Sequence, residues 1–178
     1  GKNKVILAKI ISSLIFVLSI YLLFGTLNFT LHAAIYGLDG SNANIQLHGW
    51  YYQSPYNFTF SELYLVSMGL SLIGLLYIAV ITLFISSKVK SPFITVILSA
   101  AVLYIPKIDV SEISYTANIV LDLLPINMMN AAEHFELGVF YNLFDMALLQ
   151  PIMMIFTAAL VSALLITFTY KSFKNHQA

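Results

Sequence analysis

The sequence predicts an all-α membrane protein: a polytopic helix bundle with four transmembrane helices, and short outer-leaflet helices, re-entrant or interfacial, between the third and the fourth. Two observations predict this fold. Of the 178 residues, 60% are hydrophobic and only 9% are charged, whereas soluble domains carry about 25% charged residues. Three apolar runs are also long enough to cross the membrane, which takes about 20 helical residues. The composition therefore excludes the class of ordinary soluble enzymes.

The first span is predicted at residues 5–28, with Lys9 as its only charge. We expect the Lys9 side chain to extend to the cytoplasmic surface. The run is too long for the core of a signal peptide and lacks a small-residue cleavage site. The second span is predicted at residues 62–87, where Thr59 and Glu62 match a helix-capping box. The last is predicted at 150–171, with Pro151 in its first turn.

The segment 91–106 contains a shorter apolar run between Pro92 and Pro106. By length alone it is either a re-entrant segment or a short span. If it spans, seven of the eight lysines lie on one side of the membrane and only Lys107 lies on the other. Such an asymmetry marks the lysine-rich side as cytoplasmic. If it is re-entrant, Lys171 and Lys174 change sides and the asymmetry weakens. We therefore predict four spans within a single transmembrane domain, residues 1–178, with both ends of this segment cytoplasmic.

Two extracytoplasmic segments follow from these spans, residues 29–61 and 107–149. All eight acidic residues then lie on the outer side: Asp39, Glu62, Asp109, Glu112, Asp122, Glu133, Glu136 and Asp145. The second segment is far longer than an ordinary connection of about 4–6 residues, yet much of it is apolar. Backbone in contact with lipid must satisfy its own hydrogen bonds. We therefore predict short helices at, or dipping into, the outer leaflet, broken near Pro125.

Small residues recur at helical spacing in three of the predicted spans. The sets are Ser67, Ser71 and Gly74; Ser91, Thr95 and Ser99; and Ala158 with Ser162 and Ala159 with Ala163. Small residues let helix backbones approach closely in lipid, where no hydrophobic force drives helices together. We interpret the pattern as close helix packing within a bundle or with another chain. The alternative is a polar transport path.

No catalytic, cofactor-binding or metal-binding residue is predicted. The chain contains no cysteine, no arginine, no P-loop and no His-Glu-x-x-His motif. The nearest approach to a ligand cluster is Glu133, His134 and Glu136. On a helix His134 would point about 100° away from the two carboxylates, so we expect solvated outer-face charges; a metal or proton role is the alternative. His32 and His48 are expected at the membrane interface and in a polar loop. The formal net charge of zero leaves no basic face for nucleic acid.

Four stretches carry a family pattern: GKNKVILAK at residues 1–9, YGLDG at 36–40, YYQSPYN at 51–57 and LLPINM at 123–128. With the order of the elements, they resemble the permease (membrane) subunits of bacterial type-2 ABC exporters over nearly the whole chain. The resemblance implies the C-terminal four of six spans, so the chain is expected to be a fragment in the cell (plasma) membrane. It further implies an ABC ATPase subunit that supplies ATP hydrolysis, a second permease half, and an exit gate formed by the outer helices.

A rival hypothesis is a non-catalytic membrane anchor or assembly subunit of a membrane complex. The two hypotheses differ in what accompanies the chain. The exporter hypothesis predicts an ATPase gene beside this one and further spans before Gly1. The anchor hypothesis predicts a stable complex without an ATPase. The sequence leaves open the substrate of an exporter and the choice between homodimeric and heterodimeric permease halves.

Overall fold

The computed structural model describes residues 2–143 and 146–176, which are mostly helical. The long helices are α1 (Lys2–Tyr36), α2 (Phe60–Lys88) and α5 (Gln150–His176). In the described ranges these are the three helices long and apolar enough to cross a membrane, which is compatible with a membrane protein. The apolar helix that follows α2 is shorter: α3 (Pro92–Tyr104) continues into a 3₁₀ turn, η2 (Ile105–Lys107).

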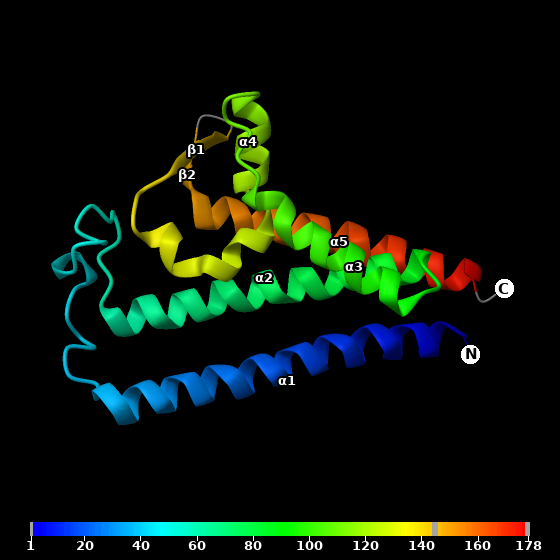
Figure 1. Ribbon diagram of the computed structural model, residues 1–178, viewed down its shortest axis with the longest axis horizontal. Helices are drawn as coiled ribbons and strands as arrows, with labels where there is room; N and C mark the ends of the chain where they lie inside the picture. Colours follow the sequence, from blue (N-terminus) through cyan, green and yellow to red (C-terminus); the bar gives the residue numbers. More distant parts are fainter. Residues whose placement is uncertain (1, 144–145, 177–178) are drawn as a thin grey trace.

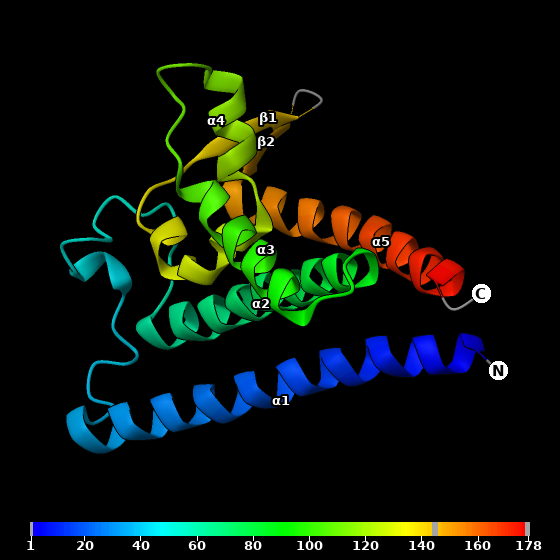
Figure 2. The ribbon, with the colours of Figure 1, turned by 45° about the vertical axis from the view of Figure 1, so that its right-hand side comes forward.

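The long helices lie side by side along the long axis of the molecule (Figure 1). Helix α2 runs between α1 and α5, and both ends of the chain lie at the same end of the bundle. The connection from α1 to α2, which contains the 3₁₀ turn η1 (Ile45–Leu47), lies at the opposite end. From the second viewpoint α1 again lies to one side of the bundle and α3 crosses the other side of α2 (Figure 2).

The predicted start of α2 is confirmed in detail. The Glu62 backbone N–H donates to the Thr59 hydroxyl at 3.2 Å, and the Thr59 backbone N–H donates to the Glu62 carboxylate at 2.8 Å. This reciprocal capping satisfies two backbone donors that the first helical turn cannot pair. Pro92 and Pro151 both lie in the first turn of their helices, where a missing N–H costs no hydrogen bond.

The outer segment between α3 and α5 agrees only partly with the prediction of short helices. Helix α4 (Tyr115–Asp122) and the 3₁₀ segment η3 (Pro125–Phe135) are helical, and the break near Pro125 is confirmed. After η3, however, the chain forms an antiparallel hairpin of β1 (Phe140–Leu143) and β2 (Met146–Leu149). The prediction of short helices is therefore wrong for residues 140–143 and 146–149, and the fold is mostly helical rather than all-α. Strand pairing satisfies backbone groups as a helix does, and the aromatic residues of β1 favour a strand.

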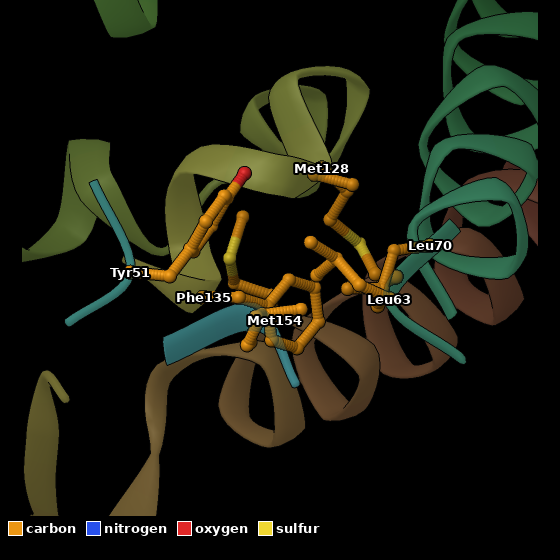
Figure 3. Packing of buried hydrophobic residues seen from close by; sticks show 9 residues of the cluster. Tyr51, Leu63, Leu70, Met128, Phe135 and Met154 are labelled. Carbon is orange, nitrogen blue, oxygen red and sulfur yellow. The ribbon is translucent and has the colours of Figure 1, made fainter. Parts of the chain in front are cut away.

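The main apolar core joins segments that are far apart in the sequence (Figure 3). Its buried side chains come from η3, α2, α5 and the connection before α2, and they are Ile45, Tyr51, Leu63, Leu70, Met128, Ala131, Phe135, Met154 and Ala158. Phe135 and Met128 are almost fully buried, at 2% and 0% exposure. A smaller cluster near the chain termini packs Ile6 and Ile10 of α1 against Leu83 and Phe173. The outer segment is thus held by the core of the molecule.

Helix α2 and η3 approach each other closely at Gly74. A Cβ atom at this position would lie 3.1 Å from the Pro125 carbonyl oxygen and 3.2 Å from the Met128 Cβ atom. The prediction that the small residues of α2 permit close packing is confirmed at Gly74. Its partner in that contact is the outer segment.

Substituting Gly74→Val should destabilise the fold by about 1–3 kcal/mol, because the new side chain meets backbone that cannot rotate away. Thermal unfolding of the chain in detergent micelles measures the change. Gly69→Val is the matched control on the same helix, since a Cβ atom at Gly69 has no neighbour within 4 Å. Equal stability of the two variants would contradict the packing described here.

Candidate functional site

The outer cap, which we define as residues 107–143 and 146–149, contains a network of polar side chains above the apolar core. Its segments are fixed from below by Phe135 and Met128, which anchor η3 in the core. They are fixed laterally by α5, because the Thr157 hydroxyl donates to the Leu123 carbonyl at 3.1 Å. The Ser114 side chain caps the start of α4 by accepting from the Ala117 N–H. The cap is therefore attached to the bundle at several points.

His134 connects η3 to the first residue of α5. Its Nε2 atom lies 3.0 Å from the Asn127 carbonyl oxygen, and its Nδ1 atom lies 3.2 Å from the Gln150 side-chain amide. A carbonyl only accepts, so Nε2 carries a proton and donates. Nδ1 faces the Gln150 Oε1 atom, and interchanging the oxygen and nitrogen of that amide gives a neutral ring a donor at Nδ1.

Two asparagines tie α4 to the neighbouring segments. The Asn127 side-chain amide donates to the backbone carbonyls of Leu121 and Asp122, at 2.9 and 3.2 Å. The Asn118 side-chain oxygen accepts from the Val110 N–H at 3.3 Å, and its amide nitrogen donates to the Asp122 carboxylate within α4 at 3.2 Å. The two Asn127 bonds reach carbonyls in the last turn of α4, where the helix has no further N–H of its own to offer. The chain break at Pro125 is thus bridged by side chains.

Electrostatics single out Asp122 within the network. Burial raises the pKa of the Asp122 carboxyl, the negative charge of Asp109 raises it further, and His134 opposes the change. Burial also raises the pKa of the Tyr141 hydroxyl on β1, with contributions from Asp122 and Tyr115. Asp122 consequently keeps its proton to higher pH than a solvated aspartate.

The three residues that the sequence singled out do not form a common site. Glu133 is exposed, as expected for a solvated charge, but His134 and Glu136 are half-buried. The expectation of a solvated His134 is corrected by its two hydrogen bonds. Phe135 between them, which the sequence analysis overlooked, is the residue that enters the core. Within the described part of the chain, no three histidine or acidic side chains are grouped so that they could hold a metal ion.

The other candidate residues are scattered over the molecule. The Nδ1 atom of His32 lies 3.1 Å from the Asn28 carbonyl near the end of α1, and His48 packs against Trp50 in the outer connection. The Lys9 Nζ atom lies 4.3 Å above the Phe173 ring at the termini end of the bundle. Asp145 lies outside the described residues. Nothing in the sequence pointed to Gln150, whereas Asn127 follows Pro125 in a pattern typical of a turn.

The outer cap therefore combines a fixed apolar anchor with a polar network that responds to protonation. Comparisons with protein-family models, curated proteins and solved structures found no match. Any assignment of function consequently starts from the residues and their geometry.

The raised pKa of Asp122 predicts a pH-dependent stability. The folded chain binds this proton more tightly than the unfolded chain, so the contribution of Asp122 to stability falls as pH rises from about 3.8 through its folded-state pKa. Asp122→Asn should therefore unfold at a higher temperature than the parent protein at pH 7, and the difference should disappear near pH 3.5. Melting curves at both pH values test this. Glu112→Gln, which removes an exposed charge from the same cap, should not reproduce the effect.

Proposed function

We propose that the chain is a permease component of an ATP-driven ABC exporter of the cell membrane. In this proposal it forms part of the substrate translocation pathway together with a second permease half. A separate ABC ATPase subunit hydrolyses the ATP. Helices α1, α2, α3 and α5 are the four spans, both ends of this segment are cytoplasmic, and the outer cap is the exit gate.

The observation that carries the proposal is the order of elements after α2. A short apolar helix is followed by a cap that packs on Gly74, and then by a long closing helix. This order fits the short fifth span, outer helices and closing sixth span that the resemblance implies. A cap anchored by Phe135 but joined to its neighbours through single hydrogen bonds is also a suitable gate, because a few bonds can break while the anchor holds.

The path of the chain supports four spans. Helix α2 ends at the end of the bundle where both termini lie, and α5 begins toward the opposite end (Figure 1). The intervening chain must therefore return. Helix α3 has 13 residues and η2 has three, which together reach roughly 26 Å at helical rises of about 1.5 and 2 Å. This length approaches the hydrocarbon thickness of about 30 Å.

The topology is directly testable because the chain contains no cysteine. Single cysteines at Asn42, Lys90, Glu112 and Lys174 are treated in intact cells with a maleimide that cannot cross the membrane. Four spans predict labelling at positions 42 and 112 and protection at 90 and 174. Protection at 112 with labelling at 174 would show that α3 does not cross, and would contradict the proposed topology.

The function is tested by purifying the tagged protein in mild detergent from its native membrane. We expect an ATPase subunit with a P-loop to copurify, and the ATPase activity of the complex to disappear when the P-loop lysine of that subunit is replaced by alanine. Gly74→Val should uncouple ATP hydrolysis from transport, because it displaces the outer cap while leaving the ATPase subunit unchanged. A stable complex without ATPase activity would contradict the exporter proposal and favour a membrane anchor or assembly subunit.

A further inference from the structure

A groove of about 690 Å³, which we call the outer groove, lies between the outer end of α1 and the beginning of α2. Its volume is in the range of about 300–1,000 Å³ typical of small-molecule sites. Gly25 and Met68 close its inner end: a Cβ atom at Gly25 would lie only 2.6 Å from the Met68 methyl group. The Tyr21 hydroxyl also donates to the Met68 carbonyl at 2.6 Å, which holds the two helices together at this level. The groove therefore has a defined apolar floor.

Aromatic rings form much of its wall. Phe29 and Tyr64 face each other across the two helices with ring centroids 5.6 Å apart, and both line the groove. His32 and Tyr36 form a second pair of rings on α1, with centroids 5.7 Å apart. Aromatic faces carry partial negative charge and attract cations that approach within about 6 Å.

The polar groups on the wall are mostly acceptors. The hydroxyls of Thr26 and Thr30 donate to carbonyls one turn earlier in α1, and the Ser61 hydroxyl donates to the Ser41 carbonyl. The Nδ1 atom of His32 donates to the Asn28 carbonyl, which leaves Nε2 of the neutral ring as an acceptor. Hydroxyls that donate to backbone carbonyls keep lone pairs that accept, so these groups favour a ligand with hydrogen-bond donors.

The charged side chains nearest to the groove are all acidic. Its lining residues include no lysine, aspartate or glutamate. The sequence contains no lysine or arginine between Lys9 and Lys88, an interval that includes every residue lining the groove. The acidic residues of this stretch are Asp39 and Glu62, which are exposed and directly follow the lining residues Leu38 and Ser61. The Glu62 carboxylate accepts hydrogen bonds from the Thr59 backbone N–H and hydroxyl, at 2.8 and 3.1 Å.

We propose that the outer groove binds a cationic amphiphile, a primary alkylammonium whose apolar chain lies toward Met68 and whose ammonium group lies among the aromatic rings and acceptors. The ammonium group donates to the acceptors of the wall and is attracted by the ring faces and by the negative charge of nearby Asp39 and Glu62. An anionic headgroup would meet no positive charge among the lining residues. This site is independent of the transport proposal.

The experiment measures protection of a single cysteine from a maleimide in lipid nanodiscs. Ala33 lines the groove, whereas its neighbour Ala34 is exposed and does not line it, so Ala33→Cys and Ala34→Cys form a matched pair. Decylammonium, decanol and decanoate serve as probes with the same chain and different heads. We expect decylammonium to slow labelling at position 33 about fivefold, with less than about twofold change at position 34, for a difference near 1 kcal/mol.

The three headgroups distinguish the possible outcomes. Protection at position 33 by decylammonium at concentrations where decanol and decanoate give little protection supports the proposal. Equal protection by all three probes would show simple partition of the alkyl chain, and overturns the selectivity for cations. Equal slowing at positions 33 and 34 by decylammonium would show adsorption to the bilayer only, and overturns the site. The assay requires no ATPase, so its outcome does not depend on whether the chain is part of an exporter.

Discussion

The close contact between η3 and α2 at Gly74 is the constraint on which the outer half of the structure depends. A side chain at this position would separate the two backbones and withdraw Met128 and Phe135 from the core. The polar network of His134, Asn127 and Asp122 is assembled on that platform, since each of its segments begins or ends beside η3. The absence of a side chain at Gly74 thus permits both the packing of Met128 and Phe135 in the core and the hydrogen bonds of the polar network.

The sequence predicts the parts of the fold that depend on local chemistry. Hydropathy and length locate the long helices, and the capping box at Thr59 and the proline at 125 mark where segments begin or break. The hairpin at 140–149 was missed because a short apolar run satisfies its backbone equally well by helix or by strand pairing, and only tertiary context selects one. Gly74 was recognised as a packing position, but its partner, 51 positions along the chain at Pro125, leaves no trace in a local pattern.

In the polar network of the outer cap, too, local features could be predicted and tertiary contacts could not. Glu133 is exposed as its type and surroundings suggest, whereas His134 contacts Gln150, 16 positions along the chain, because the pairing of β1 with β2 brings the chain back. The outer groove was not anticipated either, because its chemistry depends on hydroxyls that already donate to backbone carbonyls. A sequence lists donors and acceptors but does not show which of them are already used. The charge around the groove, by contrast, can be read from the absence of lysine between Lys9 and Lys88.

Helix α1 is packed differently at its two ends. Ile6 and Ile10 pack into a cluster with Leu83 and Phe173, while toward the outer end the contacts with α2 are made by single residues such as Tyr21 and Phe29. With 35 residues, the helix is a stiff rod about 52 Å long. It can therefore pivot about its contact with Phe173, and a tilt of about 5° would move its far tip, roughly 40 Å away, by roughly 3–4 Å. Small rearrangements near the termini would thus be amplified at the opposite surface.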